Sequence, residues 1–151
     1  MSVERDVDQA SLRRLMDESE LRNLVLDFAR CIDGRDWEGY ANLFTEDGVF
    51  EILGQRRVGR EALVAGPKGD LEKSYERTQH YVCNICVDLD GDQAQVLAYG
   101  FAVHLPVASD VGRHAELGGL NRIVARRTDE GWRIAEMHVE PIWTGGIPLE
   151  L

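Results

Sequence analysis

The chain has 151 residues, 44% of them hydrophobic and 29% charged, and its 17 basic against 27 acidic side chains give a formal charge of −10. This is the composition of one globular domain, and the acidic balance argues against a nucleic-acid partner, which would need a basic face. No stretch approaches the roughly 20 apolar residues that cross a bilayer, and the charged start, MSVERDVDQA, lacks an apolar signal core. The three cysteines (Cys31, Cys83 and Cys86) suit a reducing compartment. We therefore expect a cytoplasmic protein with neither a nucleic-acid nor a membrane partner.

Helices are predicted in the first part of the chain, after a polar stretch over residues 1–10 that we expect to be frayed. Apolar residues between Leu12 and Ile32 recur at the three- and four-residue spacing of an amphipathic helix, and Gly34 predicts its end. A second short helix is predicted from the stripe of Trp37, Tyr40, Ala41 and Phe44. GVFEIL (48–53) then predicts a strand, GREALVAG a short helix, and PKGDLEKSYER a loop or a further helical stretch.

Long strands are predicted in the second part. They cover His80–Leu89, Gln93–Leu105, roughly Leu117–Arg127, and Trp132 to about Trp143, and DLDGDQ and RTDEGW supply the turn residues of hairpins. Helices followed by antiparallel strands predict a single α+β domain over residues 1–151. In such a fold, the N-terminal helices pack on one face of a curved, mostly antiparallel sheet.

Asp33 and His80 are the residues that could carry chemistry. Asp33 follows the first helix, and His80 opens a strand whose alternation turns it toward the space between helices and sheet. A carboxylate bound to one imidazole nitrogen fixes the tautomer and stabilises the protonated ring, so the other nitrogen can remove a substrate proton near neutral pH. The alternative is structural: an Asp at a helix end commonly caps the helix, and a strand His commonly has a structural hydrogen bond.

The CNIC sequence (83–86) has the C-x-x-C spacing, but strand alternation predicts that its two cysteines point to opposite faces, too far apart for a disulfide. The same alternation groups His80, Val82, Asn84 and Cys86 on one face. His104, His114 and His138 form no close-spaced ligand set, so no metal site is predicted. His104, at the end of a strand, could border the same space as His80.

Aromatic residues provide candidate contacts to a substrate. The apolar wall is predicted to contain Phe28, Trp37, Val82 and Trp143. Candidate hydroxyl donors are Tyr40, Tyr75, Tyr81 and Tyr99, and the sequence does not choose among them.

Four segments, in this order, carry a resemblance to a known family: LRNLVLDFARCIDGRDWEGYANLFTEDGVFEI, VGREAL, TQHYVCNICVDLDGDQAQVLAYGFAVH and GGLNRIVARRTDEGWRIAEM. From about Leu12 to Trp143 the chain resembles SnoaL-like members of the nuclear-transport-factor-2-like superfamily. The subset that it resembles includes scytalone dehydratase, bile-acid 7α-dehydratase and hexachlorocyclohexane dehydrochlorinase. The resemblance implies a cone-shaped α+β barrel whose helices and strongly bent sheet enclose an apolar pocket.

The resemblance also implies roles for two residues. Asp33 matches the aspartate of that subset, in a D-x-(R/K) segment, and His80 matches the histidine that opens the third strand. Asp33 would orient His80, and His80 would act as the base of an elimination that needs neither a metal nor another cofactor. Phe28 and Leu120 stand where many relatives have tyrosines. In a dehydration, either Tyr40 or Tyr99 would replace those hydroxyls, or the leaving group would need less assistance. The tail PIWTGGIPLEL resembles tails that cover the pocket or a neighbouring subunit.

The leading hypothesis is a cofactor-independent lyase acting on a hydrophobic cyclic small molecule. A proton-shuttling isomerase or a polyketide-cyclase-type enzyme would use the same base. A third possibility, of another class, is a non-catalytic ligand-binding module or a scaffold like the β subunit of ring-hydroxylating dioxygenases. Apolar residues on both faces of YVCNICVDL and AQVLAYGFAVHL predict a homodimer or homotrimer.

Overall fold

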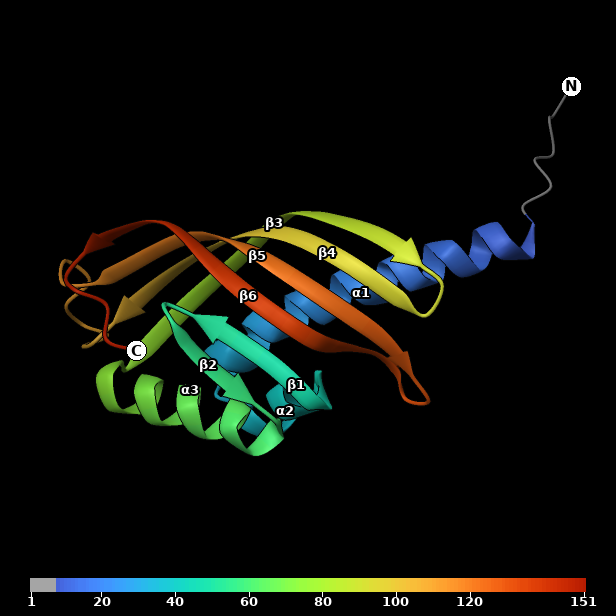
Figure 1. Ribbon diagram of the computed structural model, residues 1–151. Coiled ribbons are helices and arrows are strands. Elements are labelled where there is room, and N and C mark those ends of the chain that lie inside the picture. Colours follow the sequence, from blue (N-terminus) through green and yellow to red (C-terminus); the bar gives the residue numbers. More distant parts are fainter. Residues whose placement is uncertain (1–7) are drawn as a thin grey trace, which may run out of the picture.

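A computed structural model describes residues 8–151 as three helices and six strands (Figure 1). In chain order these elements are α1 (Gln9–Gly34), α2 (Trp37–Asn42), β1 (Phe44–Ile52), β2 (Gln55–Val58), α3 (Arg60–Ser74), β3 (Arg77–Asp90), β4 (Gln93–Leu105), β5 (Ala115–Thr128) and β6 (Gly131–Gly146). Of the ten residues expected to be frayed, positions 1–7 lie outside the described residues. The expectation is wrong for Gln9 and Ala10, which form the first turn of α1 behind an Asp8 cap.

The strands form one mixed sheet in the order β2-β1-β6-β5-β4-β3. Only β1 and β6 run parallel, and every other neighbouring pair is antiparallel. The sheet is curved and does not close, and the helices lie on its concave side (Figure 1). This confirms the predicted α+β fold, with helices on one face of a mostly antiparallel sheet.

The core lies between α1 and the concave face of the sheet. Leu21, Val25 and Phe28 are buried at the three- and four-residue spacing seen in the sequence, and they face strand residues such as Ile134 and Met137. Burial of a side chain of this size stabilises the fold by about 1.5–3 kcal/mol. This packing fixes α1, and with it the position of the residues at its C-terminal end.

Helix α3 is longer than its sequence predicted, because tertiary packing compensates for residues that disfavour helices. It includes Gly66, the last residue of the predicted short helix, and continues through Pro67 and Gly69 of the segment predicted as a loop or further helical stretch. Leu63, Pro67 and Leu71 are buried at intervals of four, so the helix buries one continuous stripe. The short strand β2 was not predicted at all.

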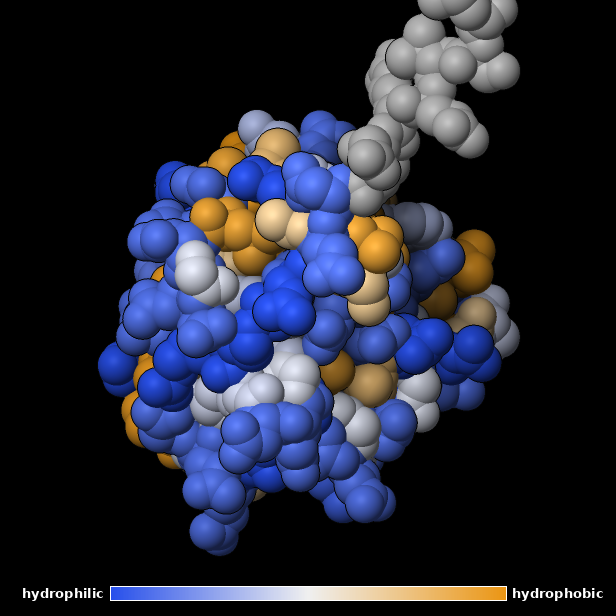
Figure 2. All heavy atoms as spheres, turned by 90° about the vertical axis from the view of Figure 1, so that its right-hand side faces the viewer, coloured by the Kyte–Doolittle hydropathy of each residue, from blue (hydrophilic) through white to orange (hydrophobic). Residues whose placement is uncertain are grey.

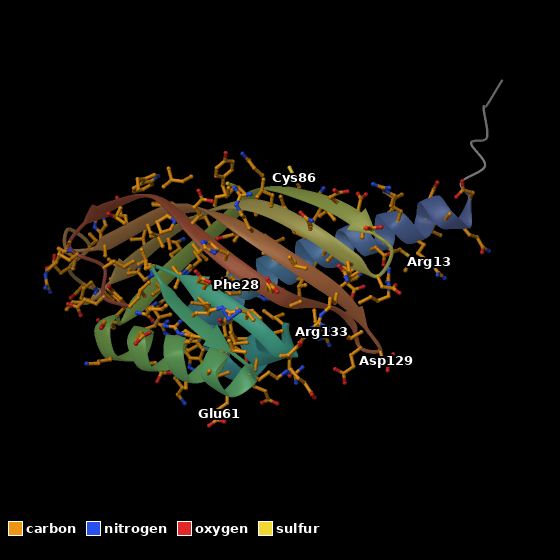
Figure 3. All side chains as sticks on the ribbon, in the orientation of Figure 1. Arg13, Phe28, Glu61, Cys86, Asp129 and Arg133 are labelled. Carbon is orange, nitrogen blue, oxygen red and sulfur yellow. The ribbon has the colours of Figure 1, made fainter. Side chains whose placement is uncertain are left out.

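A β-bulge in β3 overturns the predicted alternation. Cys83 pairs with Tyr99 and Cys86 with Leu97, so two residues of β3 oppose one residue of β4. Asn84 adopts the left-handed conformation that such a bulge requires (φ 52°). The faces therefore exchange after Cys83, and both Cys83 and Cys86 are exposed instead of pointing to opposite faces. Figure 3 shows Cys86 on the outer side of β3, whereas Phe28 lies on the side of the helices.

The surface agrees with the acidic composition. Figure 2 shows the end of the molecule at which α1 begins, where hydrophilic residues cover most of the face and hydrophobic ones form separate small patches. Within residues 8–151, no helix combines the length and the apolar character needed to cross a bilayer.

Candidate functional site

Asp33 lies in the last turn of α1, and the way this helix ends determines its position. Arg35 follows in the left-handed conformation (φ 56°), and its backbone N–H and that of Asp36 donate to the carbonyls of Ile32 and Cys31 at 3.1 and 2.9 Å. The Arg35 guanidinium donates to the carbonyl oxygen of Tyr75 at 3.2 Å, which ties the turn to the start of β3. The Asp33 carboxylate is thereby held against the sheet.

The structure brings Asp33 and His80 together. Asp33 Oδ1 lies 2.7 Å from His80 Nδ1, and Asp33 Oδ2 accepts the backbone N–H of His80 at 2.7 Å. Thr78, one inward position earlier on β3, donates its hydroxyl to Oδ1 at 2.9 Å. These contacts define the rotation of the imidazole, and His80 Nε2 hydrogen-bonds to no residue within 8–151.

The surroundings of Asp33 favour its charged form. Burial by itself would raise the pKa of this carboxyl group. The hydrogen bonds from the side chain and backbone of His80, the charge of His80, and the Thr78 hydroxyl act in the opposite direction, and the pKa is lowered overall. A carboxylate that stays ionised next to Nδ1 requires a proton on that nitrogen, so Nε2 is the basic one in the neutral ring.

A second imidazole stands beside the first. The rings of His80 and His104 are 5.4 Å apart in an edge-to-face arrangement. His104 is 2% exposed, and burial, together with the charge of His80, lowers its pKa to about 4. Its Nδ1 is buried without a hydrogen-bond partner in the described structure. His104 is therefore a neutral side chain with a free polar atom next to His80.

Both histidines border a cavity between the concave sheet face, α1 and α3. The empty space is about 750 Å³, including the mouth. Most of its wall is apolar, and a few polar side chains interrupt it, an arrangement typical of small-molecule sites. The apolar residues include Phe28, Phe50, Val82, Leu117, Val139 and Leu151, and the residues with polar side chains are His80, Tyr81, His104, Asn121, Arg57 and Asp70.

Five residues predicted to contact a substrate do not line this cavity. Tyr75 is buried, and its hydroxyl accepts the backbone N–H of Glu150 at 2.7 Å. Trp37 donates its indole N–H to Glu72 between α2 and α3, and Tyr40 is fully buried in an aromatic cluster beyond Phe28. Tyr99 alternates with inward-facing Ala98 and Gly100 and is exposed on the outer face. Trp143 also faces outward, because an extra residue in β6 between Pro141 and Trp143 shifts the register and changes the alternation.

The structure also identifies cavity residues that the sequence reasoning missed. Asn121 is 5% exposed on β5 and lines the cavity, and Gly100 on β4 leaves room for its amide. Arg57 and Asp70 come from β2 and α3, the two elements whose extent was not predicted. The only signal was a glycine, Gly100, diagonally opposite a polar residue, Asn121, whose direct partner on β4 is Ala98, and this relation is visible only once the register is known.

Residues 8–151 contain no group of three or more His, Cys, Asp or Glu side chains arranged to hold a metal ion. The polar groups of the cavity are instead hydrogen-bond donors and acceptors spaced along an apolar wall. Such a set can bind a small organic molecule and move a proton.

Solved structures with the same fold include proteins of several descriptions. A scytalone dehydratase candidate from Novosphingobium aromaticivorans is 20% identical, with a TM-score of 0.80, over 89% of this chain and 90% of that one. The dehydrochlorinase LinA-type3 from Novosphingobium barchaimii is 14% identical, with a TM-score of 0.80, over 90% and 93%. A nuclear-transport-factor-2-like protein with a cystatin-like fold, from N. aromaticivorans, is 25% identical, with a TM-score of 0.80, over 93% and 92%.

These likenesses confirm the predicted nuclear-transport-factor-2-like fold. No curated protein matches the sequence. The family model described as a SnoaL-like domain matches residues 13–138, which is most of the chain. The protein belongs to the SnoaL-like domain family.

Proposed function

We propose that the protein is a cofactor-independent lyase that uses His80 as a base and Asp33 as its partner. The observation that carries this proposal is the 2.7 Å contact between Asp33 Oδ1 and His80 Nδ1 at the wall of a largely apolar cavity. The contact leaves His80 Nε2 as the basic nitrogen. A base placed in this way contributes roughly 10²–10⁴-fold to the rate of a proton transfer.

In the proposed elimination, His80 Nε2 takes a proton from a carbon next to an activating group. The electron pair of the broken C–H bond forms a carbon–carbon double bond, and the leaving group departs from the adjacent carbon with the electrons of its own bond. Asp33 offsets the charge of the resulting imidazolium. When the leaving group is hydroxide, the proton on Nε2 is returned to it, and water is the second product.

His104 and Asn121 are proposed to hold the substrate. The unpartnered Nδ1 of His104 suits a hydrogen bond from a substrate hydroxyl, because the ring remains neutral. The Asn121 amide is placed to donate to a carbonyl oxygen or accept from a hydroxyl. Phe28, Val82 and Leu117 supply apolar wall against which a ring system can pack.

The descriptions of structural neighbours agree with this reaction class. A dehydratase removes water and a dehydrochlorinase removes hydrogen chloride, and proteins so described share the fold of this chain. At these identities the likeness concerns the fold alone, so the proposed chemistry rests on the contacts of Asp33 and His80. The apolar wall supports a hydrophobic, cyclic substrate.

Self-association is proposed through the outer face of the sheet. Tyr81 and Phe101 stack at 5.9 Å, and Phe101 lies 5.5 Å from Trp143, so an aromatic row crosses from β3 to β6. Tyr81 and Trp143 are each about half exposed in one subunit, at 49% and 47%. A second copy of the chain packed against this row would bury it.

The proposal can be tested on a panel of cyclic β-hydroxy ketones and halogenated rings. Turnover is followed by the ultraviolet absorbance of the new double bond. Asp33→Asn and His80→Gln should each abolish turnover while leaving the far-ultraviolet circular dichroism unchanged. His138→Gln, which alters an exposed strand residue remote from the cavity, is the control.

Two other results would point away from a lyase. If protons exchanged into a ligand or its double bond moved without loss of a group, the protein would be an isomerase with the same base. If ligands bound without reaction, and bound equally well after His80→Gln, the protein would be a binding module.

A further inference from the structure

Arg57 places a positive charge in the wall of the largely apolar cavity. It lies on β2, its side chain is 12% exposed, and it borders the same empty space as His80. The neighbouring Arg56 has a side chain that is 55% exposed and lies 4.0 Å from Glu51 on the outer face. Arg57 is therefore the arginine of β2 that faces inward.

Part of the Arg57 guanidinium is not engaged by the protein. Its Nη2 donates to Asp70 Oδ2 at 2.7 Å and to Gln55 Oε1 at 2.7 Å. Neither Nη1 nor Nε donates to any residue among 8–151. A guanidinium carries five N–H donors, so three of them have no acceptor in the described protein. None of these Arg57 atoms is among the buried side-chain atoms that lack a partner, so the free donors remain accessible and a ligand can supply their acceptor.

The fold makes room for Arg57. A Cβ atom at Gly66 of α3 would overlap Nε and Cδ of Arg57, so the missing side chain lets Arg57 lie against the helix in its present conformation. Glycine inside a helix is less favourable than alanine, because its backbone loses more conformational freedom on folding. Gly66 thus makes α3 less stable as a helix at the position where Arg57 packs against it.

The positive charge of Arg57 acts on the cavity more strongly than the negative charge of Asp70. The Asp70 side chain is 34% exposed, nearly three times the fraction for Arg57, so water screens the carboxylate better than the guanidinium. The field of Arg57 also reaches the interior. Burial raises the pKa of Tyr40 strongly, and the charge of Arg57 acts to lower it.

We propose that Arg57 is a specificity-determining residue that binds a carboxylate, and that the substrates are hydrophobic ring compounds carrying an acid group. A carboxylate is the planar, charged acceptor that suits a guanidinium best. This inference rests on the proposed function for the reaction, but it concerns ligand recognition and can be tested without turnover. Asp70, which also borders the cavity, and Gln55 both accept from Nη2 of Arg57, so Nη1 and Nε are the donors left for the ligand.

The test compares acids with their neutral amides by isothermal titration calorimetry at pH 8. The pairs are benzoate and benzamide, cinnamate and cinnamamide, and 2-naphthoate and 2-naphthamide. A charge-assisted hydrogen bond should make at least one acid bind roughly 10- to 100-fold more tightly than its amide. Arg57→Gln should remove this preference and leave amide binding unchanged, whereas Arg56→Gln should keep it.

Asp70→Asn distinguishes recognition of a carboxylate ligand by Arg57 from a purely structural role of the Arg57–Asp70 ion pair. If Arg57 recognises the ligand, removal of the competing carboxylate should tighten acid binding. If the pair only joins β2 to α3, Asp70→Asn should lower the melting temperature and leave acid binding unchanged or weaker. The proposal fails if no acid binds more tightly than its amide to the wild-type protein, or if Arg57→Gln keeps the preference. His80→Gln should retain the preference, so loss of catalysis and loss of recognition are distinguishable.

Discussion

Asp33 contacts His80 through both of its carboxylate oxygens: Oδ1 at the ring nitrogen Nδ1 and Oδ2 at the backbone N–H, each at 2.7 Å. The same side chain therefore fixes both the strand position of His80 and the rotation of its ring. The position and orientation of the His80 imidazole therefore depend on one carboxylate, that of Asp33 at the end of α1.

Asp33→Asn should lower kcat/KM by about 10²–10⁴-fold on any substrate that the panel identifies. The amide keeps the shape of the carboxylate, but it lacks the charge that stabilises the imidazolium and can orient the ring with the wrong tautomer. Steady-state kinetics measure the loss. A variant that kept more than a tenth of the wild-type activity would show that Asp33 is structural.

Thr78→Val should lower the stability of the fold, because it removes one of three hydrogen bonds to Asp33. Loss of one bond to a charged group predicts a decrease of about 1–3 kcal/mol in the free energy of unfolding. Urea denaturation measures this decrease. An unchanged stability would mean that water replaces the Thr78 hydroxyl at no cost.

His104 should make the fold less stable in mild acid. Its pKa falls from 6.5 to about 4 on folding, so between these values the unfolded chain binds the proton more readily and the free energy of unfolding decreases as the pH falls. The loss amounts to roughly 2.5 kcal/mol near pH 4.5 and is absent above pH 7. Urea denaturation at several pH values measures it.

His104→Asn should remove this part of the pH dependence, whatever its effect on stability at pH 7. His138→Gln, on the exposed face, serves as the matched control and should keep the pH dependence of the parent protein. Parallel stability curves for the wild type and His104→Asn between pH 7 and 4.5 would contradict the assignment.

Asp17 should be a major contributor to stability. Its carboxylate accepts two hydrogen bonds from Arg127, at 2.8 and 2.7 Å, and one from the Trp132 indole at 3.1 Å, which joins α1 to β5 and β6. Asp17→Asn should cost about 2–4 kcal/mol in the free energy of unfolding. These hydrogen bonds lower the pKa of Asp17. The stabilisation by Asp17 is therefore fully present at pH values above the ordinary carboxyl pKa, and it is lost as the pH falls through the lowered pKa of the folded state.

Asp92→Asn is the matched comparison for Asp17, because Asp92 binds the same arginine at 2.9 Å but its side chain is 83% exposed. Solvent screening predicts a cost below about 0.5 kcal/mol. Chemical denaturation of both variants compares the two carboxylates directly. Equal costs would refute the argument from burial.

Light scattering should give a mass of two or three times the 17.0 kDa of one chain. The double substitution Tyr81→Ser with Trp143→Ser should shift the protein toward single subunits, since it removes both exposed ends of the aromatic row. A mass of one subunit for the wild-type chain would refute the proposed association.

Much of the fold could be predicted because its signals are local. The spacing of Leu21, Val25 and Phe28 specifies a helix, and the long alternating strands lie between recognisable turns. The approach of Asp33 to His80 followed from a resemblance, since no local pattern reports on residues 47 positions apart.

The cavity wall was predicted less well, because faces were assigned by counting residues along uninterrupted strands. The register shifts next to Asn84 and before Trp143 each reverse the alternation for the rest of the strand. Arg57 could not be assigned, because β2 is short and pairs only with β1 at the edge of the sheet. Bulges and edge strands are determined by tertiary contacts, which a single sequence does not display.

The bulge at Asn84 has a practical consequence for experiments on this protein. Because both cysteines of the CNIC sequence are exposed while Cys31 is buried, maleimide reagents should react at the outer surface of β3 and spare the interior. Fluorescent probes attached there would stand on the opposite side of the sheet from the chamber that holds the ligand. The folded chain thus offers two natural anchoring points for following occupancy by fluorescence without obstructing it.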